Sequence, residues 1–374
     1  YDILLMVVGT GAFLYYAFNA KAIIQQGSHF EDYQIVIGII GVLALAEVCR
    51  RSVGLPILIV AGCFLAYALT VGLSNPSLWG KLNYTIRYLF YGKEGVLSTP
   101  INVCSKFIVV FIVFGAFLER TGIADYFIQV ANGLVGRFSG GPAKVAVVAS
   151  ALLGVVSGSS VANTVGSGSV TIPLMKEAGY KPEFAGATEA AASTGGQIMP
   201  PIMGAAAFLM ADYVQLPYGQ IALKAVLPAL LYFTGIFISV HLEAKKLGLK
   251  GLPKEQLPKM GPLLKKSYLL LPLILLIYLV STSQKSIQYA AALSIVACIF
   301  VTLFSRETRI TPMRILEALA SGGQGAITVA AACGIAGIIA GTITMTGLAN
   351  VIINAIVVLA GDSVLIALFL TMIC

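Results

Sequence analysis

Charged side chains are scarce in this chain of 374 residues. They make up 11% of the sequence, whereas apolar residues make up 58%. Soluble globular domains hold about 25% charged and roughly 45–50% apolar residues. A soluble chain of this length could not bury so much hydrocarbon, because surface area outruns core volume at this size. With a mean hydropathy of +0.92, the composition excludes a soluble domain and makes the lipid bilayer part of the solvent.

Spacings that would indicate a metal site or a disulfide framework are also missing. The sequence has two histidines and no CxxC or Cys/His pattern. Because the cysteines fall mostly within apolar runs, we interpret them as small buried hydrophobic residues: Cys49, Cys63, Cys104, Cys298, Cys333 and Cys374. No charged segment with a cleavage site follows Tyr1, so we expect the chain to be part of something longer.

A membrane span needs about 20 mostly apolar residues. Such stretches predict an all-α, polytopic membrane protein, and the clear candidates are Ile3–Phe18, Tyr33–Cys49, Leu55–Leu73, Ser105–Leu118, Tyr218–His241, Tyr268–Val280, Ile287–Phe304 and Gln324–Met345. Two further stretches, Gly141–Met175 and Phe184–Ala211, are interrupted by Gly, Ser and Pro, and a last one starts at Ser363.

The net charge of +8 is gathered in loops, which argues against nucleic acid as a partner and follows the positive-inside rule. The loop Glu243–Lys266 holds seven lysines against two glutamates, so we assign it to the cytoplasm. The loops 19–32 and 212–220 are poor in basic residues and are expected outside. Ser74–Val103 is also placed outside, with an interfacial amphipathic helix.

The first interrupted stretch predicts a re-entrant hairpin. Each limb, Gly141–Gly154 and Val161–Met175, has about 15 residues and therefore measures roughly 22 Å as a helix. That length ends near the middle of a membrane about 30 Å thick. A plain span would also invert every later loop, so we expect the chain to return, with the hairpin tip in Val156–Ser160.

An internal repeat follows from two similar segments at an offset of 225 residues. Thr121–Ala124 reads TGIA and Thr346–Ala349 reads TGLA, each after an apolar span and before an amphipathic stretch that ends in Gly136 or Gly361. Their expected opposite sidedness indicates an inverted-topology repeat. A second hairpin tip is then expected near positions 382 to 385, with 363–374 as its first limb and half of a binding site in this chain.

Two clusters of small polar residues are the candidate binding site. Ser157–Ser169 is rich in Gly, Ser, Asn and Thr, whose neutral oxygens suit Na⁺, while a half-helix N-terminus after the tip suits an anion. Ala192–Pro201 pairs Gly195-Gly196 with Pro200-Pro201, and is expected to break its helix and leave the carbonyls of about 192–196 unpaired. The alternatives are a close-packed helix crossing for the first cluster and a simple proline kink for the second.

Glu189 lies about one helical turn before the second break. An intramembrane carboxylate is by default a functional residue. It is alternatively neutral and hydrogen-bonded, or paired with Lys144 or Lys176.

Several motifs follow one another along the chain: Gly115–Glu119 with Thr121-Gly122, Gly141–Lys144, Ser157–Asn163, Ile172–Met175 and Ser193–Pro201. In this order they resemble the large membrane subunit of the tripartite ATP-independent periplasmic (TRAP) transporters. The sequence of these motifs is similar to the branch in which small and large permease subunits are fused. Members of that branch are often paired with the TAXI type of binding protein. The resemblance runs from about Leu97 to Cys374, and residues 1–96 look like the end of the small subunit and its connector.

The resemblance implies an elevator-type secondary transporter in a bacterial or archaeal inner membrane. Its transport domain would carry two opposed hairpins, couple to Na⁺ by symport and receive organic acids from an extracytoplasmic substrate-binding protein. The residues that it implies for Na⁺ are Ser157, Ser159, Ser160, Asn163, Thr194, Gly195 and Gly196, and those for the substrate are Ser160, Asn163, Thr194, Gln197 and Pro200.

The expected organisation has five parts. Residues 1–96 are small-subunit-like scaffold, 97–136 a scaffold span with an amphipathic arm, 137–213 the first hairpin and broken helix, 214–321 scaffold helices with the basic loop, and 322–374 the start of the second repeat.

Three other functions fit the composition less well. A channel usually repeats pore-lining rings through oligomers, whereas one chain with opposed broken hairpins favours alternating access. An intramembrane serine protease would need a base near Ser159, but His29 and His241 are predicted at loop or membrane-end positions. A purely structural or assembly role would be favoured if Asn163→Ala and Thr194→Ala left uptake by the intact parent protein unchanged.

Overall fold

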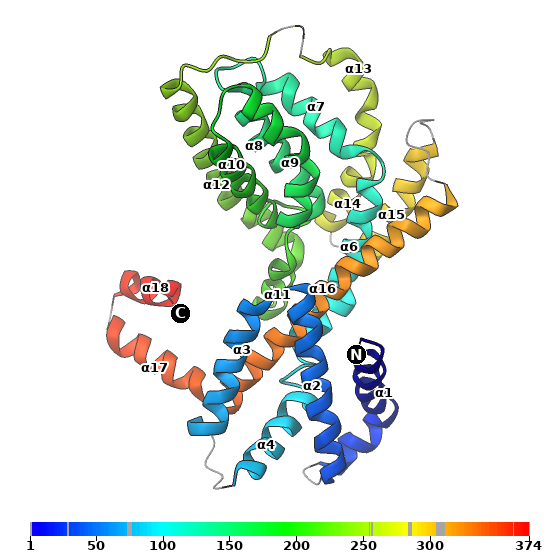
Figure 1. Ribbon diagram of the computed structural model, residues 1–374, viewed down its shortest axis with the longest axis vertical. Helices are drawn as coiled ribbons and strands as arrows, with labels where there is room; N and C mark the ends of the chain where they lie inside the picture. The colour runs from blue at the N-terminus through cyan, green and yellow to red at the C-terminus, as the bar shows by residue number, and fades with distance from the viewer. Residues whose placement is uncertain are drawn as a thin grey trace. The chain divides into compact units, whose positions relative to one another are not determined.

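The structure is a computed structural model. It describes residues 2–27, 30–72, 77–253, 255, 257–282, 286–303, 311–361 and 363–373. Every regular element in these ranges is a helix (Figure 1), which confirms the all-α prediction. His29, Leu73, Phe304 and Cys374 lie outside the described residues.

Six helical stretches are long and apolar enough to cross a membrane, as expected for a polytopic protein. They are Asp2–Gln26, Asp32–Ser52, Thr99–Glu119, Tyr218–Lys246, Gly261–Thr282 and Pro312–Met345. Shorter apolar helices cover Leu55–Thr70, Gly141–Ser157, Ala205–Val214, Ile287–Leu303, Leu348–Ala360 and Val364–Ile373.

The chain divides into two compact units, one of residues 1–104 with 327–374 and one of residues 105–326. The first unit contains α1 (Asp2–Gln26), α2 (Asp32–Ser52), α3 (Leu55–Tyr67), η1 (Ala68–Gly72), α4 (Leu78–Ile86), η2 (Arg87–Tyr91), α5 (Thr99–Val103), the later part of α16 (Pro312–Met345), α17 (Leu348–Ala360) and α18 (Val364–Ile373). Its buried core includes Ile35, Leu89, Phe90, Ile335 and Ile338.

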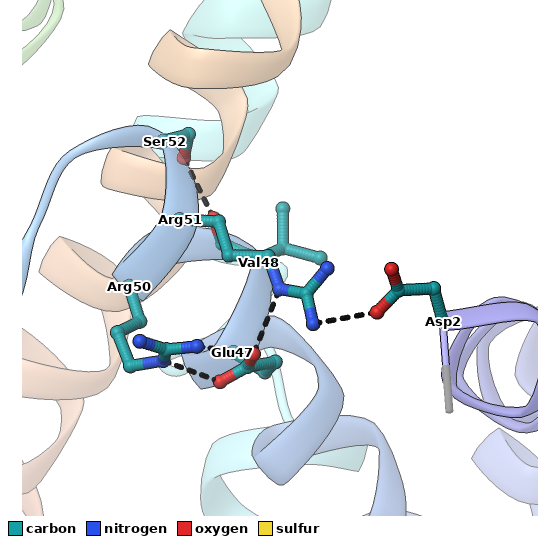
Figure 2. Close-up of polar contacts among 6 residues, drawn as sticks. All are labelled: Asp2, Glu47, Val48, Arg50, Arg51 and Ser52. Atoms are coloured by element: carbon teal, nitrogen blue, oxygen red, sulfur yellow. Dashed lines mark hydrogen bonds and ion pairs between the residues drawn. The ribbon is translucent and has the colours of Figure 1, made fainter.

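A charged cluster ties the end of α2 to the start of α1 in this unit. The Glu47 carboxylate accepts from Arg50 Nε at 2.7 Å and from Arg51 Nε at 2.8 Å, and Arg51 also reaches Asp2 at 2.8 Å (Figure 2). Both arginines follow Glu47 within one helical turn, so local spacing alone brings them together. Glu47 is therefore neutralised by its own helix and is no candidate for a binding site.

The second unit contains α6 (Val109–Glu119), α7 (Ile123–Val135), α8 (Gly141–Ser157), α9 (Ser160–Glu177), α10 (Pro182–Thr194), η4 (Gly195–Gln197), α11 (Ala205–Val214), α12 (Tyr218–Lys246), α13 (Met260–Lys265), η6 (Lys266–Leu270), α14 (Leu271–Thr282), α15 (Ile287–Leu303) and the first part of α16. α8, α9, α10 and α12 pack around a cluster that includes Val147, Met175, Ala192, Phe233 and Val240.

The two segments of the expected repeat share a local conformation. Gly122 and Gly347 both precede a helix of 13 residues in the left-handed region, at φ/ψ of 79/17° and 71/9°. That conformation favours glycine because it lacks a Cβ atom. The TG pair in both copies is therefore a helix-start signal, which agrees with the repeat, whose sidedness stays a prediction.

One of the cysteine predictions is wrong. Cys63 is exposed, whereas Cys49, Cys104, Cys298 and Cys333 are buried. Cys63 lies in the apolar helix α3. A helix that is apolar on all sides is typical of a membrane span, in which exposed apolar side chains face lipid.

Candidate functional site: the hairpin tip and the broken helix

The predicted hairpin break lies within the expected tip. α8 ends at Ser157 and α9 begins at Ser160, with Gly158 in the left-handed region at φ 58°. A Cβ atom on Gly158 would lie 2.6 Å from the carbonyl oxygen of Ile202, so only glycine fits this turn. The Ser159 hydroxyl then accepts from the Ala162 amide at 3.3 Å and caps α9.

The second break also occurs where the prolines and glycines predict it. α10 ends at Thr194, a single 3₁₀ turn covers Gly195–Gln197, and the next helix starts at Ala205. Between them the Gly204 amide donates to the Gln197 carbonyl at 2.8 Å, and the Tyr218 hydroxyl donates to the Pro201 carbonyl at 2.6 Å. One hydrogen bond therefore joins the two ends of the irregular segment, and the other holds its middle.

The prediction that the carbonyls before the prolines are unpaired is wrong for three residues. Ser193 accepts from the Gly195 amide. Gly195 and Gly196 accept from the amides of Ile198 and Met199 at 3.2 and 3.3 Å. The 3₁₀ turn continues the hydrogen bonding that the α-helix gives up, as it commonly does at helix ends.

The tip and the break meet through a close backbone crossing. A Cβ atom on Gly196 would lie 2.9 Å from the Gly154 Cα and 3.0 Å from Asn163 Nδ2. Beside this crossing, Gln197 Nε2 donates to the Ser160 hydroxyl at 2.9 Å. The structure thus brings together four of the predicted site residues, Ser160, Asn163, Gly196 and Gln197.

The remaining predicted residues are placed less closely. Thr194 is exposed, and its hydroxyl donates to the carbonyl of Ala190 in its own helix at 2.7 Å. The Ser157 hydroxyl contacts the backbone of Ser159, and both residues are half-buried. Gly195 is buried, and Pro200 is half-buried beside the cis peptide bond that joins it to Pro201.

Asn163 has one half of its side-chain amide in use. The side chain is 2% exposed, and Nδ2 donates to the Ser150 carbonyl at 2.8 Å. Its Oδ1 is buried and has no hydrogen-bond partner within the described ranges. Because a buried acceptor without a partner is costly, this oxygen is suited to receive a ligand.

Glu189 is held by four hydroxyl groups from three helices. Ser150 of α8, Ser167 and Thr171 of α9, and Ser193 of α10 all lie within hydrogen-bond distance of its carboxyl oxygens, the first and last at 3.1 and 3.0 Å. The side chain is completely buried. Of the two alternatives to a functional role for Glu189, the structure therefore supports hydrogen bonding and not pairing with a lysine.

The lysines considered as partners of Glu189 lie elsewhere. Lys144 Nζ is 3.0 Å from His241 Nδ1 and lies over the Phe237 ring, while Lys176 is exposed. No described lysine or arginine forms an ion pair with Glu189. Ser150 and Thr171 were not among the predicted site residues, although the spacing Asn163, Ser167, Thr171 places three polar groups on one helical face.

The base of the hairpin is closed by an aromatic contact. Tyr180, in the turn between α9 and α10, stacks on Phe184 at 5.5 Å, and its hydroxyl donates to the Gly140 carbonyl at 3.4 Å. Burial, with a smaller effect of Glu243, raises the pKa of Tyr180 to about 12. Tyr180 therefore remains a neutral donor at physiological pH.

A family profile described as "Tripartite ATP-independent periplasmic transporter, DctM component" matches residues 40–374. The chain belongs to this family. The match covers both polar breaks, so the recognition made on their motifs is confirmed.

Three relatives illustrate the range of the TRAP family. The C4-dicarboxylate TRAP transporter large permease protein DctM of Vibrio cholerae is 30% identical over 216 residues, 58% of this chain and 44% of the relative. The sialic acid large permease SiaM of the same organism is 28% identical over 51% of this chain and 44% of its own length. The isethionate permease DctMQ of Oleidesulfovibrio alaskensis is 30% identical over 38% and 22%.

This TRAP permease chain spans about half the length of the first two relatives. Its relatives are transporters and not enzymes, which argues against the protease alternative. The geometry agrees, since His241 contacts Lys144 and the Ser159 hydroxyl accepts from the Ala162 amide.

Proposed function

We propose that the full-length protein is a Na⁺-coupled symporter that takes up a small organic acid across a bacterial or archaeal inner membrane. It receives the acid from an extracytoplasmic substrate-binding protein and works by an elevator mechanism. The proposal rests mainly on the contact between the hairpin tip and the broken helix, beside which Asn163 Oδ1 has no hydrogen-bond partner among the described residues. Membership in the TRAP family supports the transport of an organic anion.

The tip offers the ligands that an alkali cation requires. Na⁺ is a hard cation and binds neutral oxygens, including backbone carbonyls and hydroxyls at broken helices. Asn163 Oδ1 would be one ligand, and the hydroxyls of Ser157, Ser159 and Ser160 lie on the same turn. Gly195 and Gly196 would contribute carbonyl oxygens, each of which has a second lone pair besides its hydrogen bond. The Thr194 hydroxyl donates its proton to the Ala190 carbonyl, but its oxygen keeps two lone pairs that a cation would use.

The substrate carboxylate is proposed to meet the start of α9. The first amides of a helix have no intrahelical partners and carry partial positive charge, which favours an anion. Ser160 and Gln197 form a hydrogen-bonded pair at this end, and Pro200 and Thr194 border it along the chain. Neither polar break contains a lysine or an arginine, so helix-end donors would carry the recognition.

The Glu189 hydrogen bonds fit a transport domain that moves as one body. They connect both limbs of the hairpin to α10, and the Gly154–Gly196 crossing adds a contact near the tip. An elevator mechanism needs such internal stiffness, because the bound cargo must travel with its whole site.

Uptake by proteoliposomes tests this proposal. The full-length protein is reconstituted with its binding protein, and labelled dicarboxylates and sialic acids are offered with and without an inward Na⁺ gradient. We expect uptake that requires both the gradient and the binding protein. Flux that needs neither would instead indicate a passive channel.

Asn163→Ala makes the test specific. Loss of one oxygen ligand is expected to raise the Na⁺ concentration for half-maximal uptake by about tenfold or more, the factor that corresponds to roughly 1.4 kcal/mol. Ser169→Ala, on the exposed side of the same helix, is the control. Unchanged Na⁺ dependence in Asn163→Ala would remove Asn163 from the proposed site.

A further inference from the structure

A small hollow in the first unit lies beside the guanidinium group of Arg87, for which the described residues provide no anionic partner. It measures about 240 Å³ and is bordered by the last turn of α1, by Phe30 and by the segment α4–η2, with Arg87, Tyr84 and Tyr88 among its lining residues. None of these residues belongs to the hairpin tip or to the broken helix.

Arg87 is unusual for a charged residue in this position. Its Nε atom is buried and has no hydrogen-bond partner in the described part of the chain, and its guanidinium carbon lies 5.5 Å from the centre of the Phe30 ring. No described carboxylate forms an ion pair with it. Guanidinium stays protonated and carries five donors, and a partly buried cation without an acceptor is costly. An external anion would supply the missing acceptor.

Lys81 and Tyr88, which are close to Arg87 along the chain, do not neutralise its charge. Lys81 Nζ donates to the Thr70 carbonyl at 3.0 Å and is therefore in use. Burial, followed by smaller effects of Glu94 and Tyr84, raises the pKa of the Tyr88 hydroxyl. Tyr88 thus remains neutral and can donate a hydrogen bond to the same anion.

Exposed apolar side chains lie at the border of the hollow and on helix α4. Ile24, which lines it, is 66% exposed, and on α4 Leu78 and Trp79 are 71% and 46% exposed. Tryptophan and tyrosine gather at membrane–water interfaces, where basic residues attract anionic headgroups. A ligand with an anionic head and a hydrocarbon tail matches both the guanidinium and the apolar border.

We propose that this hollow binds the phosphate of an anionic phospholipid, with Arg87 and Tyr88 on the headgroup and Ile24 along the acyl chain. The bound lipid anchors α4 and η2 at the membrane surface. This inference is independent of the proposed transport cycle, because it concerns residues outside the transport site.

Lipid binding by the purified full-length protein tests the proposal. The protein is titrated in mixed micelles with phosphatidylglycerol or with phosphatidylcholine, and bound lipid is counted by native mass spectrometry. We expect preferential binding of phosphatidylglycerol and an affinity about fivefold lower in Arg87→Gln, the factor that one basic residue supplies near an anionic surface. Arg87→Lys should retain most of the affinity, and Lys93→Gln, which removes an exposed charge nearby, should lower it clearly less than Arg87→Gln.

Three results would overturn the proposal: equal binding of phosphatidylcholine, unchanged affinity in Arg87→Gln, or complete displacement of the lipid by glycerol phosphate. The last would indicate a site for a soluble phosphate. If Arg87→Gln does not fold, Ile24→Ser tests the same proposal. It should weaken the lipid but leave the binding of glycerol phosphate unchanged, and unchanged lipid binding would also contradict the proposal.

Discussion

At the scale of single residues, Glu189 combines complete burial with four hydroxyl neighbours and no described cation. Burying a carboxylate is costly unless its oxygens are hydrogen-bonded. Ser167 and Thr171 also lie within reach of carbonyls one turn earlier in α9, so their hydroxyls have alternative acceptors. The hydrogen-bond network therefore depends on Glu189 to keep three helices together.

Replacing Glu189 by glutamine should destabilise the protein. The side chain keeps its shape, but one acceptor oxygen becomes a donor that faces hydroxyl groups. Because a buried polar group left without a hydrogen-bond partner costs about 1–3 kcal/mol, we expect a loss of that order in the free energy of unfolding, measured by denaturant titration in detergent. Glu183→Gln, exposed in the first turn of the same helix, is the matched control. Equal stability of the two variants would show that the network contributes nothing.

At the scale of secondary-structure elements, the crossing of Gly154 and Gly196 joins the hairpin to the broken helix. Its backbones approach so closely that a single methyl group at position 196 would overlap with Gly154 and Asn163. Small residues at helix contacts permit this approach in membranes. A close-packed crossing, the alternative considered for Ser157–Ser169, thus occurs just outside that cluster, at Gly154 and Gly196, and polar groups lie beside it.

Gly196→Ala should separate these two elements. We expect a loss of roughly 1–3 kcal/mol in stability from overpacking, together with reduced Na⁺-dependent uptake. Gly186→Ala in α10, where an added Cβ atom meets nothing within 4 Å, should instead stabilise by up to about 1 kcal/mol through helix propensity. Denaturant titration and uptake assays on both variants check this, and equal behaviour would contradict the importance of the crossing.

The two repeat-related helix starts permit a paired prediction. Gly122 and Gly347 share the left-handed conformation, in which an L-residue costs about 1–2 kcal/mol. Gly122→Ala and Gly347→Ala should therefore each destabilise by a similar amount, as measured by thermal unfolding. Gly235→Ala in α12, with open space around the added Cβ atom, should not. Markedly unequal losses would argue against equivalent roles for the two segments.

At the scale of the whole molecule, the distribution of lysine and arginine predicts how the protein lies in the membrane. The lysine-rich loop after α12 is expected in the cytoplasm, and the loop between α11 and α12 outside. The structure does not contain a membrane, so this orientation stays a prediction.

Cysteine labelling in intact cells checks the orientation. In a cysteine-free background, which removes the exposed Cys63, Gln215→Cys should react with a membrane-impermeant maleimide, whereas Lys250→Cys should react only after the cells are opened. Permeabilised cells are the control for reactivity. The reverse pattern would invert the topology, and the hairpin would then enter the membrane from the opposite side.

The sequence by itself determined the helical membrane class, the family and the places where two helices break. Each depends on composition or on local backbone rules: apolar run length, the left-handed glycine at position 158, and the prolines after Gly196. These properties act within a few residues of the chain and can therefore be read along it.

Only the tertiary structure decided which polar groups meet. Gln197 reaches Ser160, Asn163 reaches Ser150, and Glu189 gathers hydroxyls from three helices. Thr194 was predicted in the same site as the tip, and its hydroxyl donates within its own helix. A partner on another helix is chosen by the packing of both helices, and a side chain several residues from a break turns toward or away from it according to that packing. No spacing along one segment contains this information.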